Sequence, residues 1–148
     1  MPSTHLSLYY HIIFSTKGRR SCIPETWEGR LYKYLGGIIH GLGGVPIEIG
    51  GASDHIHILT RLKAAYSLSD VLRKIKSNSS KWIRGCIDKR FWGWQDGYGA
   101  FTVSSGNIEG IRKYIKGQKE HHSRICFKDE YINLLRICGV EFDEKFLW

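Results

Sequence analysis

Two histidines, at positions 55 and 57, flank a single isoleucine in the segment Asp54–Leu62 (DHIHILTRL). This segment is rich in β-branched residues and follows a glycine pair, which predicts a strand. Because strand side chains alternate between faces, both imidazoles should point to the same side. Neutral imidazole nitrogens bind divalent cations well. The pair therefore indicates a metal site, although two histidines on a solvated sheet face would have the same spacing.

Tyr114 and Gln118 lie four positions apart in a segment, 107–122, whose apolar residues recur with helical spacing. Residues at this separation share one face of a helix. A tyrosine hydroxyl can form a covalent bond to phosphorus, and a nearby metal would help by polarising the phosphate. The Gln118 amide oxygen suits a hard cation such as magnesium or manganese. The alternative is a tyrosine at the edge of the core beside a solvated glutamine.

The chain is basic, with a formal net charge of +8 and a pI near 9.4. Much of the charge lies in two expected helices, which suits a groove for a phosphodiester backbone, although either series is compatible with an ordinary solvated face. The candidate DNA-binding residues are Arg73, Lys76 and Lys81 in the first of these helices, and Arg112, Lys113, Lys116 and His122 in the second. His122 also follows Gln118 by four residues, so it is either a phosphate contact or a rival metal ligand.

The elements that would position these residues follow from periodicity and turn signals. We expect strands at 5–16, 45–50, 54–62 and 100–104, a turn at Gly50-Gly51, and helices at 25–40, 67–85, 107–122 and 128–137. The order β-α-β-β-α-β is that of a ferredoxin-like α+β fold, an antiparallel sheet with helices on one face. The helix carrying Tyr114 follows as a C-terminal catalytic helix. We expect one domain over residues 1–148.

Composition narrows the class of protein. A length of 148 residues, 42 % of them hydrophobic, suits one soluble domain. We find no apolar stretch near the roughly 20 residues that span a bilayer and no secretion signal. The four cysteines are scattered without a CxxC pair, which argues against a cysteine zinc site and favours free thiols in a reducing compartment. We therefore expect a cytoplasmic protein, associated with the nucleoid when on DNA, and no membrane partner.

The His-Ile-His segment followed by Tyr-Ile-x-x-Gln resembles the single-tyrosine HUH transposases of small bacterial and archaeal insertion sequences. The resemblance covers nearly the whole chain, through HIIFSTKGRR, DHIHIL, GYGAFTVS, YIKGQKEHH and EFDEKFLW. A related branch, tied to repeated palindromes in bacterial genomes, tends to have Asn-Pro after its tyrosine. Gly117-Gln118 stands there in this chain, which favours the insertion-sequence kind.

The resemblance implies a metal-dependent homodimer that cleaves and rejoins single-stranded DNA at imperfect hairpins of element ends. It implies that Tyr114 is the nucleophile, forming a 5′-phosphotyrosine link, and that His55, His57 and Gln118 bind a divalent metal ion, magnesium or manganese. In such transposases the tyrosine helix can complete the partner's active site.

Two other classes of function share some of these features. A catalytically silent nucleic-acid-binding relative would keep the sheet and the basic helices, but would not need the four site residues together. A metal-dependent phosphoesterase without a covalent intermediate would keep the histidines but would not need Tyr114. Trapping of a protein–DNA adduct separates this last class from a transposase.

Overall fold

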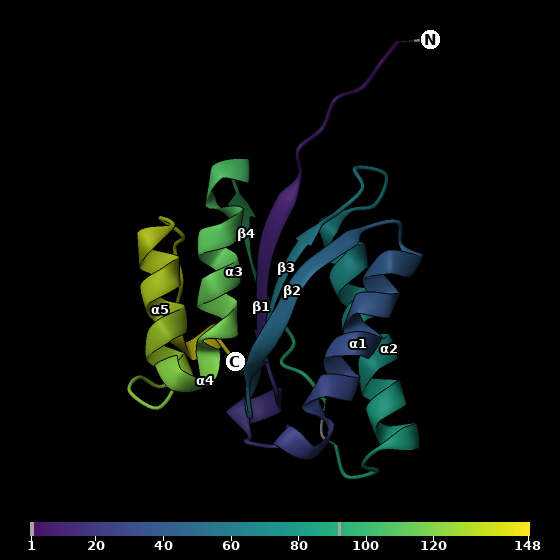
Figure 1. Ribbon diagram of the computed structural model, residues 1–148. Coiled ribbons are helices and arrows are strands. Elements are labelled where there is room, and N and C mark those ends of the chain that lie inside the picture. The colour runs from purple at the N-terminus through teal and green to yellow at the C-terminus, as the bar shows by residue number, and fades with distance from the viewer. Residues whose placement is uncertain (1, 92) are drawn as a thin grey trace.

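A four-stranded antiparallel sheet with strand order β2-β3-β1-β4 forms the middle layer of the computed structural model, which describes residues 2–91 and 93–148 (Figure 1). The strands are β1 (Tyr9–Ser15), β2 (Val45–Ala52), β3 (His55–Arg61) and β4 (Gly99–Val103). The helices are α1 (Glu25–Gly41), α2 (Leu68–Cys86), α3 (Ile108–Lys116), α4 (Gln118–His121) and α5 (Phe127–Ile137). Short 3₁₀ helices span Lys17–Arg19, Ser105–Asn107 and Glu144–Phe146. The predicted βαββαβ order and the α+β class are confirmed.

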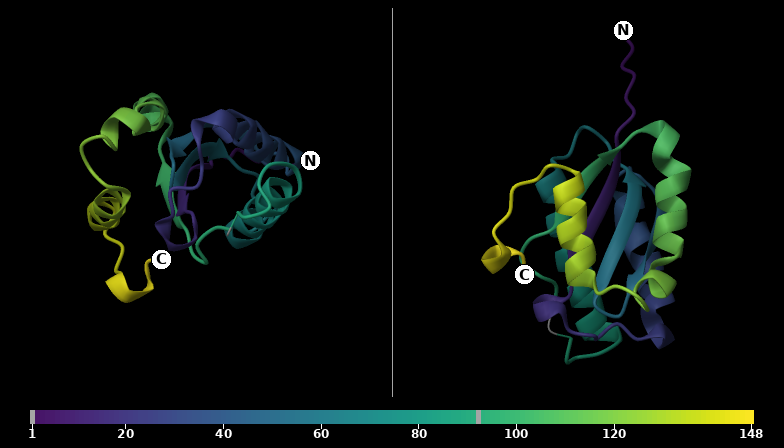
Figure 2. Two further views of the ribbon diagram at one scale, coloured as in Figure 1. Left: turned by 90° about the horizontal axis from the view of Figure 1, so that it is seen from below. Right: turned by 90° about the vertical axis from the view of Figure 1, so that its left-hand side faces the viewer.

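Helices α1 and α2 cover one face of the sheet, as Figure 2 shows from below. The main core lies between them and the sheet, where Ile12, Phe14, Ile56 and Ile58 pack against apolar side chains of both helices. The Ser67 hydroxyl accepts a hydrogen bond from the Asp70 backbone N–H and caps the start of α2, as its sequence predicts.

Helices α3, α4 and α5 cover the opposite face (Figure 2). Alternation along β1 and β3 sends the intervening side chains to this side, and they are buried: His11, Ile13, His55, His57 and Leu59. Ile13 packs with Phe127, Tyr131 and Leu135 of α5. The two layers of helices therefore enclose an apolar core on one face of the sheet and a mixed polar and apolar core on the other.

The expected turn at Gly50-Gly51 is wrong, because both glycines lie inside β2 and pair with His57 and Ile56 of β3. These positions need glycine because other backbone atoms lie too close to leave room for a side chain, and not because the chain turns there. A Cβ on Gly50 would lie 3.0 Å from the Ile115 carbonyl oxygen of α3, and one on Gly51 only 2.1 Å from the His55 carbonyl oxygen. The hairpin turns instead at residues 53–54.

The expected continuous helix over 107–122 is interrupted at Gly117, whose backbone (φ −87°, ψ 10°) is not helical. Glycine lowers the stability of a helix interior, so the interruption falls where the chain is weakest. The first strand is also shorter than expected. It begins at Tyr9, and residues 2–8 extend beyond the sheet without regular structure (Figure 1).

Candidate functional site

The two histidines of β3 point from the sheet towards α3–α5. Both are fully buried, so the alternative of a solvated sheet face does not apply. β3 is a central strand, paired with β1 on one side and β2 on the other, which fixes its register. Phe127 of α5 stacks on the His55 ring, with centroids 4.1 Å apart and planes at 14°. The imidazoles are therefore held rigidly at the interface between the sheet and the C-terminal helices.

Tyr114 and Gln118 reach the same place from α3 and α4. The Tyr114 ring meets the His57 ring edge-on with centroids 5.7 Å apart. Gln118 is 1 % exposed, and its Oε1 lies 2.9 Å from His55 Nε2. All four residues that the sequence singles out for chemistry thus meet within one chain, even though Gly117 separates the helices that carry Tyr114 and Gln118.

A carboxylate that sequence reasoning missed, Glu130 of α5, lies at the centre of this group. Its side chain is buried, and Oε2 accepts hydrogen bonds from the Tyr114 hydroxyl and from Gln118 Nε2. Its Oε1 lies 3.1 Å from His57 Nε2 and 3.0 Å from His122 Nε2. Oε2 therefore faces the tyrosine and His121, while Oε1 faces the imidazoles of β3 and of His122.

His55 and His122 each have a second hydrogen-bond partner, at Nδ1. This partner determines which ring nitrogen carries the proton when the ring is neutral. His55 Nδ1 lies 2.7 Å from Asp54 Oδ1, and His122 Nδ1 lies 2.8 Å from the Ile125 carbonyl oxygen. Since a carboxylate and a carbonyl only accept, both Nδ1 atoms donate. Each neutral ring then turns the lone pair of Nε2 towards Gln118 Oε1, at 2.9 Å and 2.8 Å.

His57 is oriented by another histidine. Its Nδ1 lies 2.8 Å from Nε2 of His11, and the two rings stack with centroids 5.1 Å apart. His11 is on β1, diagonally opposite His57 in the register that pairs Ile13 with His57. When His57 donates from Nδ1 to His11, its Nε2 lone pair also faces the carboxylate.

Burial and neighbouring charge set the protonation of these groups. Burial lowers the pKa of His57 to about 4 and that of His11 to about 3, so both are neutral at physiological pH. Burial lowers the pKa of His122, but its hydrogen bond and charge interaction with Glu130 outweigh this, and the net shift is upward. Burial, then the Glu130 carboxylate, raises the pKa of Tyr114 above its ordinary value, so the phenol stays protonated.

The donor set fits a divalent cation. Ligand atoms of His55, His57, His122 and Glu130 all lie within 4.8 Å of one another, and Gln118 Oε1 faces two of the imidazoles. When the rings are neutral and His57 donates from Nδ1 to His11, these nitrogens and oxygens are all acceptors, and acceptors repel unless a positive charge separates them. A proton on an imidazole can do this, and so can a metal ion. Imidazole and carboxylate ligands together suit a first-row divalent metal.

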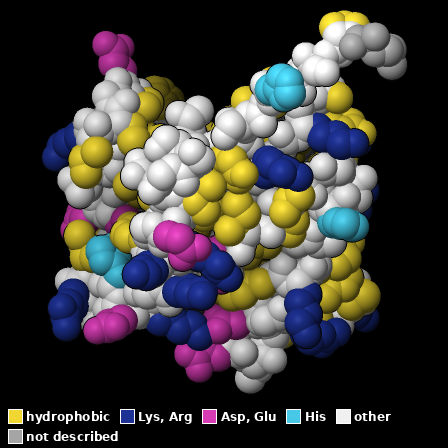
Figure 3. Space-filling model, turned by 45° about the horizontal axis from the view of Figure 1, so that its top comes forward, with side chains coloured by type: hydrophobic (Ala, Val, Ile, Leu, Met, Phe, Trp, Pro, Cys, Tyr) yellow, Lys and Arg dark blue, Asp and Glu magenta, His cyan; other side chains and the backbone are white. Residues whose placement is uncertain are grey.

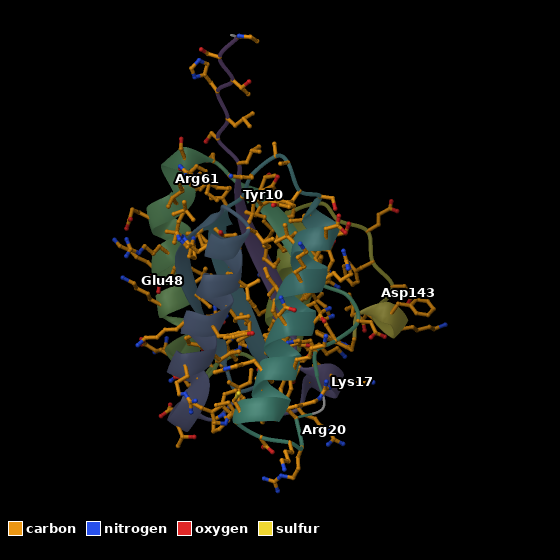
Figure 4. The ribbon with its side chains drawn as sticks, turned by 90° about the vertical axis from the view of Figure 1, so that its right-hand side faces the viewer. Tyr10, Lys17, Arg20, Glu48, Arg61 and Asp143 are labelled. Carbon is orange, nitrogen blue, oxygen red and sulfur yellow. The ribbon has the colours of Figure 1, made fainter. Side chains whose placement is uncertain are left out.

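The structure does not bring the two series of candidate DNA-binding residues together. Helices α2 and α3 lie on opposite faces of the sheet (Figure 1), so they cannot form the two walls of one groove. Arg73 and Lys76 instead line a cleft of about 470 Å³ between α2 and the segment 93–98. Lys17 lies at one end of this cleft and is labelled in Figure 4. Lys81 does not line it.

The cations of α3 and α4 are largely neutralised by acidic partners. Arg112 Nε donates to Glu48 of β2 at 3.2 Å, and Lys116 lies 3.8 Å from the same carboxylate. Glu48 is labelled in Figure 4 beside α3. Lys119 pairs with Glu25 and Glu28 of α1. On the face shown in Figure 3, Lys and Arg accordingly lie beside Asp and Glu rather than forming one positive field.

Sequence signals exist for one of the two missed residues. Glu130 stands between Phe127, Tyr131 and Leu134, at spacings that put it on the apolar face of α5, where an unpaired carboxylate is costly. A carboxylate at such a position indicates that the surface against which α5 packs carries a polar partner. His11 gives no such signal, because its proximity to His57 depends on strand pairing across 46 residues.

Comparisons with known proteins identify a family and two solved structures of the same fold. The family model "Transposase IS200 like" matches residues 4–118. A crystal structure of a candidate transposase from Deinococcus radiodurans R1 has 21 % identity and a TM-score of 0.63, covering 80 % of this chain and 96 % of that one. A tyrosine transposase associated with REP elements, solved bound to a REP hairpin, has 14 % identity and a TM-score of 0.61, covering 84 % and 76 %. No curated protein sequence matches the chain. None of the described helices is long and apolar enough for a membrane span.

Proposed function

Because the chain belongs to the IS200-like transposase family and is a tyrosine transposase, we propose that it cleaves and rejoins single-stranded DNA with Tyr114 as the nucleophile. The observation that carries this proposal is the meeting of the Tyr114 hydroxyl with a buried cluster of His55, His57 and Gln118 around one carboxylate. A pure binding module has no use for a tyrosine hydroxyl at a convergent set of metal donors.

In the proposed reaction, the Tyr114 oxygen attacks a backbone phosphorus and forms a 5′-phosphotyrosine ester with the fragment on the 3′ side of the cleavage. The bond from phosphorus to the 3′ oxygen breaks, and that oxygen takes up a proton, so the phenol proton balances the free 3′ hydroxyl. Rejoining is the reverse attack by a 3′ hydroxyl on the ester, which returns the proton to the phenol. No external energy source is needed, because one phosphodiester is exchanged for another.

We assign His55, His57 and Gln118 as metal ligands in this reaction. When bound, a divalent cation supplies charge neutralisation and polarisation of the phosphate. Asp54 and His11 orient the two imidazoles through their Nδ1 atoms, as second partners of metal-bound histidines commonly do. The donor cluster beneath the half-buried Tyr114 is itself buried, which limits the water that reaches the ester from that side.

We propose that the DNA partner is a hairpin at the end of a mobile element. The support is a fold shared with the REP-associated tyrosine transposase, which was solved bound to a REP hairpin. Arg73 and Lys76 in the cleft beside α2 are the candidate phosphate contacts, and Arg73 is held there by an exposed ion pair with Asp70. Lys113 of α3 is a further candidate, because we find no acidic partner for it among the described residues. A homodimer, which the family resemblance implies, belongs to the same proposal and is measured by light scattering.

The test is a search for a covalent adduct. The purified protein is incubated with Mn²⁺ and labelled single-stranded oligonucleotides that tile the DNA flanking its own gene, followed by denaturing electrophoresis. We expect a protein–DNA adduct that disappears in Tyr114→Phe while binding to the same oligonucleotide is retained. Tyr66→Phe, which removes the hydroxyl of an exposed tyrosine, is the matched control and should keep the adduct.

Other outcomes separate the alternative functions. Cleavage that persists in Tyr114→Phe without an adduct would identify a phosphoesterase that does not use the tyrosine. Binding of the flanking DNA without cleavage in the wild-type protein would identify a silent nucleic-acid-binding relative.

A further inference from the structure

Glu130 lies beyond residues 4–118, the part of the chain that the family model matches. Its side chain is 1 % exposed. Among the described residues, only histidines lie within ion-pair distance of the Glu130 carboxylate: His55, His57, His121 and His122. No described Lys or Arg pairs with it. A buried carboxylate that has no permanent cation beside it is costly, so its retention at this place needs a positive partner.

The arrangement of the two carboxylate oxygens indicates where that partner belongs. Oε1 lies 3.6, 3.1 and 3.0 Å from the Nε2 atoms of His55, His57 and His122. Oε2 accepts hydrogen bonds from Tyr114 and Gln118, and His121 Nε2 lies 3.1 Å from it. Three imidazole nitrogens and one carboxylate oxygen therefore converge, all within 4.8 Å of one another.

His122 is prepared for this role in the same way as His55. Its Nδ1 donates to the Ile125 carbonyl oxygen, which leaves the Nε2 lone pair of the neutral ring directed at the cluster. A histidine that bound a backbone phosphate would instead need an N–H directed at solvent, yet His122 Nε2 faces inward to Gln118 and Glu130. Between the two roles left open by its sequence position, this geometry favours the metal ligand.

We propose that Glu130 and His122 are ligands of the same divalent cation that His55 and His57 bind. The inference rests on the proposed function, since it extends the metal site assigned there. It makes the site one of three histidines and a carboxylate, with the Gln118 amide oxygen beside them. It also ties the nucleophile to the metal through one side chain, because the carboxylate that binds the cation is the one that accepts the Tyr114 hydrogen bond.

Two consequences follow from this donor set. Imidazole ligands suit manganese and later first-row metals better than magnesium, so the site should prefer Mn²⁺ to Mg²⁺. Because Glu130 is part of α5, cation binding should also hold that helix against the sheet.

The test measures metal affinity and needs no DNA. Binding of Mn²⁺ to the metal-free protein is followed by loss of the electron paramagnetic resonance signal of the free ion. We expect Glu130→Gln and His122→Ala each to weaken Mn²⁺ binding by about tenfold or more, the scale on which even outer partners of a metal site act. Asp129→Asn, the same change of charge at the exposed neighbouring residue of α5, should bind as the wild type does.

The outcomes distinguish the inference from the function beneath it. Wild-type affinity in both Glu130→Gln and His122→Ala, together with loss of binding in His57→Ala, would overturn the inference and leave the histidine site intact. Wild-type affinity in His57→Ala would overturn the metal assignment itself. Since a variant could lose affinity by unfolding, circular dichroism of each metal-free variant is measured first.

A second readout does not depend on affinity. The visible absorption of bound Co²⁺ reports the number and kind of its ligands, so Glu130→Gln should change that spectrum at saturating Co²⁺. An unchanged spectrum would overturn the role of Glu130 as a ligand.

Discussion

Replacement of Gly50 by alanine tests whether the tyrosine helix is positioned by its close approach to β2. The added Cβ would lie 3.0 Å from both the Cγ2 atom and the carbonyl oxygen of Ile115, the residue next to Tyr114. Carbon atoms prefer separations of about 3.5–4.0 Å, so α3 would have to move by roughly 0.5–1 Å. The carbonyl is part of the helix backbone and cannot avoid the clash by changing a rotamer.

We expect Gly50→Ala to lower the free energy of unfolding by about 1–3 kcal/mol, the usual cost of overpacking. For a domain of this size, each kcal/mol corresponds to roughly 2–5 °C in Tm. Because displacement of a reacting group by about 1 Å can cost 100-fold in rate, we expect adduct formation to slow by about tenfold to 100-fold. The assays are thermal melting by circular dichroism and the time course of adduct formation.

Gly37→Ala is the matched control. Gly37 is an exposed residue of α1, and a Cβ there would meet nothing within 4 Å. Alanine is favoured over glycine inside a helix by about 0.5–1 kcal/mol, so this variant should melt slightly higher and react at the wild-type rate. If Gly50→Ala matched the wild type in both Tm and rate, the contact between β2 and α3 would not be what positions Tyr114.

Three further predictions concern protons, metal and DNA. Since the pKa values of His11 and His57 are lowered to about 3 and 4, the unfolded chain binds more protons than the folded chain below pH 6.5. The Tm of the metal-free protein should therefore fall as the pH drops from 6.5 to 4. A Tm that does not change with pH would contradict the burial of both histidines as neutral rings. Asp54→Asn should weaken Mn²⁺ binding by about tenfold or more through the imidazole it orients, and an unchanged affinity in the same resonance assay would exclude that role. Arg73→Ala should lower the slope of log K against log salt for single-stranded DNA by about 0.7, because Arg73 lines the cleft and its ion pair with Asp70 is exposed. Lys119→Ala, which removes a cation outside the cleft that pairs with Glu25 and Glu28, should leave the slope unchanged. Equal slopes in both variants would remove Arg73 from the interface.

The parts of the site that local periodicity determines could be predicted from the sequence. The period of two in β3 puts His55 and His57 on one face, and the spacing of four residues brings Tyr114 and Gln118 together even across Gly117. Tertiary packing determines the rest. Glu130 meets His57 across 73 residues, and only the docking of α5 on the sheet brings them together.

The basic surface shows the same limit. Counting cations along α2 and α3 predicts two positive helices, but not that they lie on opposite faces of a sheet (Figure 2). Nor does it predict that Glu48 of a neighbouring strand pairs with Arg112. Net charge is a property of composition, whereas a continuous positive groove depends on how elements pack. The sequence pattern therefore gives the net charge but says little about whether the cations form a continuous groove.

The two halves of the site, on β3 and on the C-terminal helices, should also differ in how often they open to solvent. His55 and His57 stand on a central strand over the main core, so their amide protons should exchange with solvent only when the whole domain unfolds. The C-terminal layer is attached through smaller apolar clusters, built around Ile13 and Leu59, and such a layer can open locally while the sheet stays folded. The time for which the site stays assembled is then determined by how long this layer stays packed on the sheet, and not by the melting temperature of the domain.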